Sequence, residues 1–197
     1  MSRLISLLLL ISFAFGDVPD DLFSQANDAM IYEKYEDAIQ TYESILELGH
    51  ENADLYYNLG NAYYRLHYIG QGIWAYSNAL KLSPRETDFH HNIAVAEARR
   101  IDRIDMPEPF FLLQAYRDIK SNFTLREWIV LGSLVLLFQA MWVFGLQFGW
   151  IRGSMSQSIL TGLIVVTLGI HVVAADKYFQ DNRTNTGVVI ANGVDAY

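Results

Sequence analysis

The sequence predicts an all-α fold, in which a short solenoid of helical hairpins is followed by a two-helix transmembrane hairpin and a short β-prone tail. Three observations predict it. A hydrophobic pattern with helical spacing recurs after a shift of 34 residues, as from Tyr42 to Tyr76. Two long apolar segments follow residue 127, and Val188-Val-Ile190 precedes a turn signal, Asn192-Gly193.

Residues 1–16 have the layout of a secretory signal peptide. Arg3 gives a positive start, and Leu4–Phe15 is an apolar run too short to span a bilayer. Ala14 and Gly16 place small residues before a cleavage site. We therefore expect export, with cleavage after Gly16. In one alternative, residues 1–16 are an uncleaved signal anchor, which would still place the following domain outside the cytoplasm. In the other alternative, they form a buried helix at the start of that domain.

Residues 17–104 contain a repeat of helical hairpins. The 34-residue shift aligns Ala26 with Gly60, and small residues at such positions let two helices cross closely. Pro84 ends the last helix of the second copy, because proline lacks an amide hydrogen. The second copy also carries the pattern Tyr56-x-x-Leu59-Gly60-x-x-Tyr63. This pattern and this period resemble the tetratricopeptide repeat (TPR).

A third unit begins at residues 88–103, because Asn92 follows Asn58 by the same 34 residues. No second helix is expected after it, since Met106-Pro-Glu-Pro109 interrupts the chain. A lone helix at the end of a solenoid acts as a cap with a polar outer face. The sequence therefore predicts two full repeats and a capping helix, which is near the minimum for a stable stack.

The TPR resemblance implies a peptide-binding groove, because the first helices of such units line a concave surface. The predicted groove residues are Asn27, Asp54, Tyr57, Asn58, Asn61, Tyr64, Arg65, Asp88, His91 and Asn92, with Phe23, Met30, Ile31 and Val95 beside them. Asparagine can both donate to and accept from a peptide backbone. Asp54 and Asp88 make the expected groove acidic and argue against the carboxylate ligands of chaperone-binding TPRs. Alternatively, Asn58 and Asn61 only satisfy helix and loop backbone.

Residues 128–150 and 158–175 are predicted to cross the membrane as a tight antiparallel hairpin. The first segment has no charged residue or histidine, and it has a tryptophan at each end, which suits anchoring at the membrane interface. His171 lies in the second segment. A histidine within a membrane is a functional hypothesis, but this one has no acidic partner. We therefore expect a neutral His171 bonded to Gln139 or to a backbone carbonyl.

Residues 105–127 are predicted to form a linker with an amphipathic juxtamembrane helix. Its apolar face carries Leu112, Tyr116, Ile119 and Phe123. This face lies either on the membrane surface or against the TPR cap.

Export would place the TPR domain in the periplasm, and two spans would return the extracytoplasmic tail, residues 176–197, to that side of a bacterial inner membrane. Arg117, Lys120 and Arg126 flank the presumed outer side, whereas the inner loop has only Arg152. The tendency of basic residues to stay in the cytoplasm would prefer the reverse. We base the predicted orientation on the signal peptide and not on the distribution of basic residues.

Composition and motifs argue against several functions. The 197-residue chain is 52% hydrophobic and carries a formal net charge of −8, which is unsuited to nucleic acid, whose binding needs Lys and Arg. It has no cysteine, so disulfides and thiol catalysis are excluded. The sequence has no Gly-rich phosphate loop, HExxH or GxSxG. We therefore predict no enzyme, no cofactor, no metal site and no small-molecule substrate.

The order of these parts resembles BatE-like TPR proteins, which are encoded in the aerotolerance (Bat) operons of Bacteroidetes and their relatives. The likeness is carried by residues 55–92, including Tyr57-Asn-Leu-Gly-Asn-Ala-Tyr63 and Leu80-Lys-Leu-Ser-Pro84. Many such proteins continue into an SH3-like β-domain, and residues 187–194 resemble its opening strand.

This resemblance implies a membrane-anchored TPR scaffold for protein partners in a cell-envelope complex. The implied partners are von Willebrand-A-domain membrane proteins and, indirectly, a MoxR-type ATPase, in tolerance of oxidative stress. The alternative function is a structural assembly or maturation factor of the envelope that acts through its transmembrane hairpin within the membrane lipid.

Overall fold

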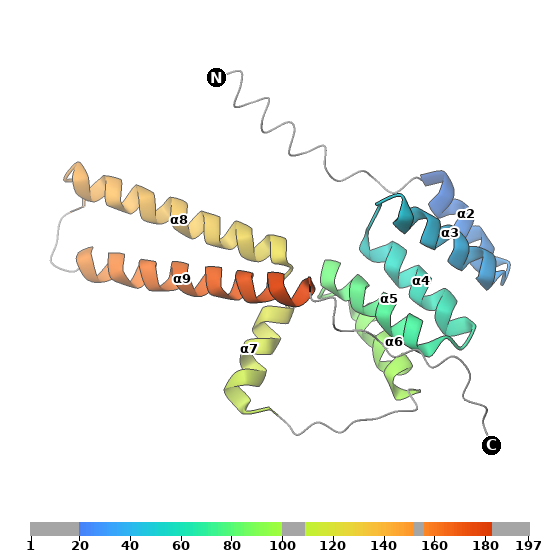
Figure 1. Cartoon of the computed structure of the whole chain (residues 1–197). Coiled ribbons are helices and arrows are strands. Elements are labelled where there is room, and N and C mark those ends of the chain that lie inside the picture. Colours follow the sequence, from blue (N-terminus) through green and yellow to red (C-terminus); the bar gives the residue numbers. More distant parts are fainter. Residues whose placement is uncertain (1–19, 100–108, 152–155, 183–197) are drawn as a thin grey trace. The chain divides into compact units, whose positions relative to one another are not determined.

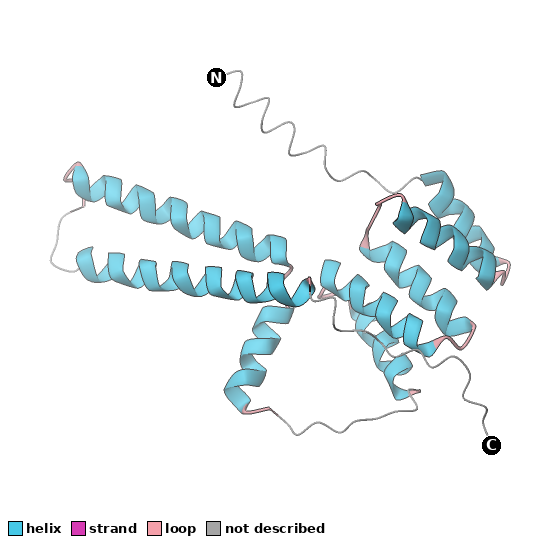
Figure 2. Cartoon of the chain, viewed as in Figure 1, coloured by secondary structure: helices cyan, strands magenta, loops and turns pink. Residues whose placement is uncertain are grey.

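The structure is a computed structural model that describes residues 20–99, 109–151 and 156–182 (Figure 1). Within these ranges the chain forms eight α-helices and no strand, so the predicted all-α fold is confirmed (Figure 2). The helices belong to two compact units, one with α2–α6 and one with α7–α9. The predicted signal peptide, the loop at Arg152 and the β-prone residues 188–194 lie outside the described residues.

The first unit consists of two helical hairpins and a single closing helix. The helices are α2 (Asp20–Ile31), α3 (Tyr35–Glu47), α4 (Ala53–Arg65), α5 (Ile69–Leu82) and α6 (Thr87–Ala98). In the turns inside the two hairpins, Glu33 and His67 have φ values of 58° and 62°. These two left-handed residues are again 34 positions apart, so the repeat extends to the backbone of its turns. Asn52 caps α4, where its side-chain oxygen accepts a hydrogen bond from the Leu55 amide at 2.6 Å.

Close helix crossings are built on the small residues that the repeat alignment identified. Ala26 and Ala38 of the first hairpin are fully buried, next to Tyr42. In the second hairpin, Gly60 faces the ring of Tyr76, and a Cβ at Gly60 would lie 2.7 Å from that ring. The absence of a side chain at Gly60 therefore lets the Tyr76 ring pack closely against α4.

The closing helix α6 covers the second hairpin. Phe89 and Ala96 are buried, where Phe89 packs with Tyr56 and Ala79, and Ala96 with Ile73 and Tyr76. Glu97 and Arg99 are exposed. This arrangement has the buried inner face and polar outer face that a solenoid cap requires.

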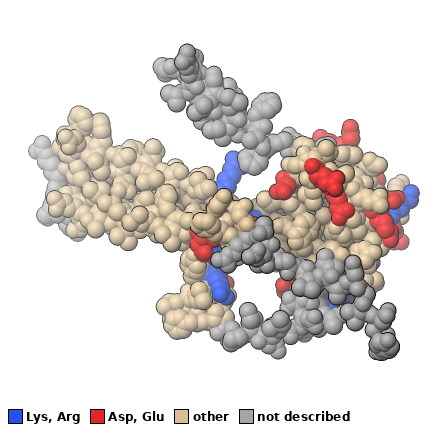
Figure 3. Space-filling view, in the orientation of Figure 1, with Lys and Arg blue, Asp and Glu red and all other residues tan. Residues whose placement is uncertain are grey.

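The second unit contains α7 (Phe111–Ser121), α8 (Leu125–Gln147) and α9 (Ser156–Asp181). Helices α8 and α9 pack together, and both are long and apolar enough to cross a membrane. Most of their apolar side chains are exposed, among them Leu137 at 62% and Val165 at 64%. On the face drawn in Figure 3, the hairpin has no charged side chain along most of its length.

The helix bounds differ from those of the predicted spans. Helix α8 starts at Leu125, ahead of Trp128, because Thr124 and Glu127 form a capping box there. Helix α9 continues to Asp181, past residue 175, since residues 176–181 contain neither glycine nor proline. The helical hairpin therefore extends beyond the apolar segments at its open end.

Polar contacts hold α7 at this open end of the hairpin. The Tyr116 hydroxyl donates to Asp176 Oδ2 at 2.6 Å, and Lys120 Nζ lies 2.6 Å from the same oxygen. Trp128 Nε1 donates to the Lys120 carbonyl at 3.4 Å. Tyr116 was expected on the apolar face, but it is turned toward Asp176. Other members of that face stay exposed, with Leu112 at 59% and Ile119 at 57%.

The crossing of α4 and α5 gives a testable prediction about two glycines. We expect Gly60→Ala to lower the free energy of unfolding by about 1–3 kcal/mol, because the new Cβ would overlap the Tyr76 ring. Gly72→Ala is the matched control, since its Cβ would meet its nearest atom, the Gly60 carbonyl oxygen, at an ordinary 3.5 Å. This control should raise stability by about 0.5–1 kcal/mol, as alanine normally does inside a helix. Thermal unfolding followed by circular dichroism measures both, and equal shifts would contradict the close crossing.

Candidate functional site

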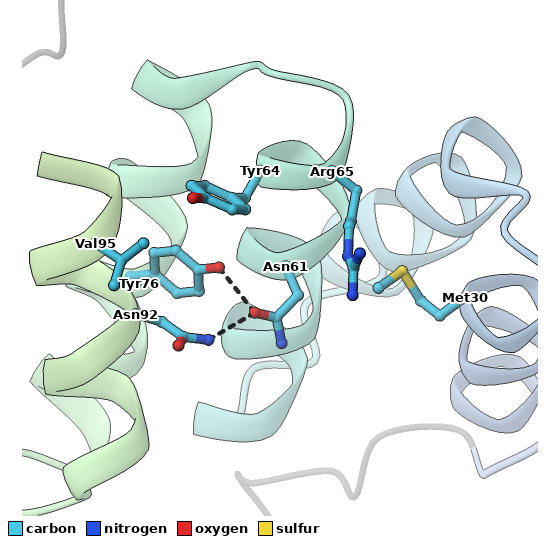
Figure 4. A pocket seen from close by; sticks show the side chains of 7 residues that line it. All are labelled: Met30, Asn61, Tyr64, Arg65, Tyr76, Asn92 and Val95. Carbon is cyan, nitrogen blue, oxygen red and sulfur yellow. Dashed lines mark hydrogen bonds between the residues drawn. The ribbon is translucent and has the colours of Figure 1, made fainter. Parts of the chain in front are cut away.

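A cavity of about 490 Å³ opens between α2, α4 and α6. We call it the groove and define it by its lining residues, which are Met30, Asn61, Tyr64, Arg65, Tyr76, Asn92 and Val95 (Figure 4). Tyr76 comes from α5 and is only 1% exposed, so it forms the floor. The first helices of the successive units therefore supply the walls, as the TPR resemblance implied.

Side-chain hydrogen bonds join the groove wall to its floor. Asn61 Oδ1 accepts from the Tyr76 hydroxyl at 2.8 Å and from Asn92 Nδ2 at 2.9 Å (Figure 4). Asn92 Nδ2 also lies 3.0 Å from the Tyr57 hydroxyl, which accepts from it. One asparagine oxygen thus connects α4 to both α5 and α6.

The same arrangement occurs one repeat earlier. Asn27 Oδ1 accepts from the Tyr42 hydroxyl at 2.6 Å and from Asn58 Nδ2 at 3.1 Å. The sequence separations are the same in both sets, 15 residues for the asparagine–tyrosine pair and 31 for the asparagine–asparagine pair. We call these two sets of three side chains the asparagine–tyrosine ladder. It joins each repeat to the next unit through side chains.

The ladder leaves part of each groove asparagine unused. Asn61 Nδ2 and Asn92 Oδ1 have no hydrogen-bond partner among the residues that the structure describes. Both side chains line the groove. The groove therefore presents one free amide donor group and one free amide acceptor, which is the pairing that an extended peptide backbone needs.

Burial keeps the ladder tyrosines in their neutral form. It raises the pKa of Tyr42 to about 12, although the nearby Asn58 amide lowers it in part. Burial likewise raises the pKa of Tyr76, and the neighbouring Tyr57 adds to the effect. These hydroxyls stay protonated at physiological pH, so they serve as hydrogen-bond donors and not as acid–base groups.

Other predicted groove residues lie away from the cavity lining. Tyr57 is partly buried, and its ring stacks on Phe89 at a centroid distance of 4.6 Å. Asn27 and Asn58 belong to the first set of the ladder. His91 is exposed on α6 and does not line the cavity.

The groove differs in charge from the expectation. Asp54 and Asp88 are exposed in the first turns of α4 and α6. Asp54 therefore lies at the opposite end of α4 from Arg65, which is in the last turn of that helix. The cavity lining contains no carboxylate among the described residues, and it does contain the Arg65 guanidinium. The guanidinium of Arg99 lies over the Tyr64 ring at 4.8 Å. The lining of this cavity therefore carries a positive charge, and Asp54 and Asp88, which led us to expect an acidic groove, are not part of that lining.

Sequence reasoning did not include Tyr76 or Arg99 in the site. Tyr76 could have been found, because the Asn27–Tyr42 spacing recurs at Asn61 and Tyr76. No comparable signal marks Arg99. As for metal chemistry, the described residues contain no group of three His, Asp or Glu side chains placed to hold an ion.

A TPR repeat is found at residues 32–66 by comparison with protein-family models. This range spans α3 and α4, and it contains Tyr42 and Asn58 of the ladder. Comparison with curated proteins gives no match. A TPR repeat indicates a scaffold for protein–protein interaction. The groove lies on the unit that contains this repeat.

Buried tyrosines should make the repeat unit sensitive to alkali. The pKa of Tyr42 is raised to about 12, and those of Tyr56, Tyr63 and Tyr76 are raised further, mainly by burial. An unfolded tyrosine ionises near pH 10, so stability should be intact below about pH 10 and fall as the pH rises to 12 and above.

We expect tyrosinate absorbance from these four residues to appear together with the loss of helical circular dichroism. Ionisation of these four tyrosines near pH 10 with the helices intact would contradict the burial of their hydroxyl groups.

Proposed function

We propose that this protein is a membrane-anchored adaptor whose groove binds an extended segment of a protein partner. The observation that carries the proposal is the groove on the repeat unit, with free amide groups of Asn61 and Asn92 next to Arg65. TPR repeats generally bind proteins, and peptide backbone is the ligand that paired amide donors and acceptors suit.

The lining also limits the chemistry of the bound segment. Met30 and Val95 give the groove apolar surface on α2 and α6, and Arg65 supplies a positive charge between them. We infer that the segment carries an apolar side chain next to a carboxylate. The guanidinium can bind a carboxylate through two parallel hydrogen bonds.

The hairpin of α8 and α9 supplies the anchor in this proposal. Its length, apolar composition and exposed side chains support insertion into a membrane. The exposed apolar face of α7 supports the alternative in which this helix lies on the membrane surface. We place the repeat unit and the C-terminus in the periplasm at a bacterial inner membrane, on the strength of the signal-like residues 1–16.

The resemblance to BatE-like proteins suggests a cellular role. It proposes a cell-envelope complex with von Willebrand-A-domain membrane proteins, linked to a MoxR-type ATPase, in aerotolerance. The support for this role is the order of parts in the sequence and the likeness of residues 55–92.

A second function is favoured by polar side chains in the hairpin. Gln139, Thr167 and His171 form a hydrogen-bonded group within α8 and α9. Such a group suits an assembly or maturation factor that acts through its membrane helices. The two functions differ in which unit holds the partner.

The groove can be tested by a charge reversal that leaves the fold intact. Tyr57 and Asn61 are unsuitable for this test, because both contribute to the packing of the repeat unit. Arg65 is exposed and lines the groove, so Arg65→Glu should abolish partner capture by a photo-crosslinker placed at Val95. Lys34→Glu is the matched control, since Lys34 is exposed outside the groove. Capture at residue 95 that survives Arg65→Glu would count against the groove and in favour of the hairpin.

Reporter fusions test the proposed orientation. Alkaline phosphatase, which is active only after export, should be active when fused after Asp105 and inactive when fused after Ser154. The first site follows the repeat unit, and the second lies between α8 and α9. The reverse pattern would place the repeat unit in the cytoplasm, as the distribution of basic residues prefers.

A further inference from the structure

Two exposed hydroxyl groups in the hairpin donate hydrogen bonds within their own helix. Ser133 donates to the Ile129 carbonyl at 2.8 Å, and Thr161 donates to the Gln157 carbonyl at 3.0 Å. Each of these hydroxyls donates to the backbone carbonyl four residues earlier, which also accepts the backbone hydrogen bond of the helix. These hydroxyls need no further partner in an apolar surrounding.

One polar group connects the two helices. The Thr167 hydroxyl lies 2.8 Å from the Leu163 carbonyl and 3.1 Å from Gln139 Oε1. Thr167 is 7% exposed, so this contact lies in the seam between α8 and α9. The Thr167 carbonyl in turn lies 2.8 Å from His171 Nδ1.

This last contact determines the form of His171. A carbonyl oxygen can only accept, so Nδ1 carries the proton. In the neutral imidazole, Nε2 is then an acceptor with a free lone pair. The ring lies against Gly132, where an added Cβ would be 3.0 Å from Cε1 and 3.4 Å from Nε2. The predicted bond from His171 to a backbone carbonyl is thus present.

Polar groups in the middle of this hairpin have no hydrogen-bond partner in the described part of the chain. They are the Gln139 side-chain NH2 group, the buried Trp142 Nε1 and the His171 Nε2 lone pair. Gln139 is half-buried and His171 is exposed, so both reach the surface of the hairpin. In hydrocarbon no water can satisfy such groups, which makes them costly to leave unpaired.

We propose that the hairpin binds a second copy of itself in the membrane, with Gln139 of each copy donating to His171 Nε2 of the other. The hairpin carries both a free donor and a free acceptor, each on a residue that contacts Thr167. In a two-fold symmetric pair, a contact from one copy to the other is repeated in reverse, so one interface forms two hydrogen bonds. A second copy is therefore complementary without any further assumption about its sequence.

The pairing rests on insertion of the hairpin and not on the groove. Hydrogen bonds between side chains are a recognised source of helix association in membranes. The reporter fusions test insertion separately. The Arg65→Glu variant should pair as well as the unaltered protein, so failure of the groove would leave this inference unaffected.

The chain contains no cysteine, which makes single-cysteine cross-linking unambiguous. The purified full chain is reconstituted in liposomes, so that the only available partner is another copy. Leu168 lies three residues before His171 and shares its helix face, and it is 61% exposed. Val166 is similarly exposed, at 51%, but it lies five residues away, which at about 100° per residue turns it about 140° from His171.

We expect Leu168→Cys to form disulfide-linked dimers under mild oxidation and Val166→Cys to form few. Adding Gln139→Leu or His171→Leu to Leu168→Cys should reduce the dimer yield about tenfold at low protein density, because both bonds are lost. Ser133→Ala should leave the yield unchanged, since that hydroxyl is already satisfied in its own helix.

Mixing distinguishes lost pairing from lost folding. A Gln139→Leu chain keeps His171, and a His171→Leu chain keeps Gln139, so a mixed pair can form one of the two bonds. Mixing the two variants in one liposome should therefore recover part of the cross-linking, which misfolded hairpins could not do. Equal yields at residues 166 and 168, or full yield with both substitutions in one chain, would overturn the proposal.

Discussion

The hydrogen bonds that Asn27 and Asn61 accept are the constraint on which the repeat unit depends. Each asparagine oxygen receives a tyrosine hydroxyl from the second helix of its own hairpin and an amide from the next unit. A hydrogen-bonded network of partly buried side chains favours one arrangement of its elements, because other arrangements break these hydrogen bonds. The five helices that the structure describes in this unit share a small core, and the ladder fixes how successive units stack, which apolar packing alone specifies less sharply.

The groove is built from the same side chains, so its stability and its recognition chemistry are linked. Asn61, Tyr76 and Asn92 belong both to the ladder and to the cavity lining. The unused half of each amide is left for a ligand, together with Arg65 and the apolar Met30 and Val95. Substituting a ladder residue would change folding and binding together. Only the residues outside the ladder can separate the two properties.

The TPR resemblance implied the residues that line the cavity, apart from Tyr76, and the repeat alignment predicted the helices and the close crossings. It could do so because the 34-residue period fixes which side chains are equivalent. It could not predict the ladder, since a helical face does not reveal which atoms of an amide meet a neighbour. The repeat period also does not reveal how far along a helix a cavity extends. Asp54 and Arg65 were assigned to one surface of α4, but they lie at opposite ends of that helix.

Both units contain polar groups without a hydrogen-bond partner, but the groove is open to water, whereas the hairpin is proposed to lie in hydrocarbon. This difference in solvent determines whether a binding partner is needed. In the groove, Asn61 and Asn92 face an open cavity, where water can satisfy the free amide atoms until a ligand replaces it. A bound segment is therefore optional for folding. In the hairpin, Gln139 and His171 would face hydrocarbon, where no water replaces the missing partner. An amide group without a partner therefore permits a ligand in the groove, whereas in hydrocarbon it favours a partner, which is why we propose reversible recognition by the groove and association of the hairpin with a second copy.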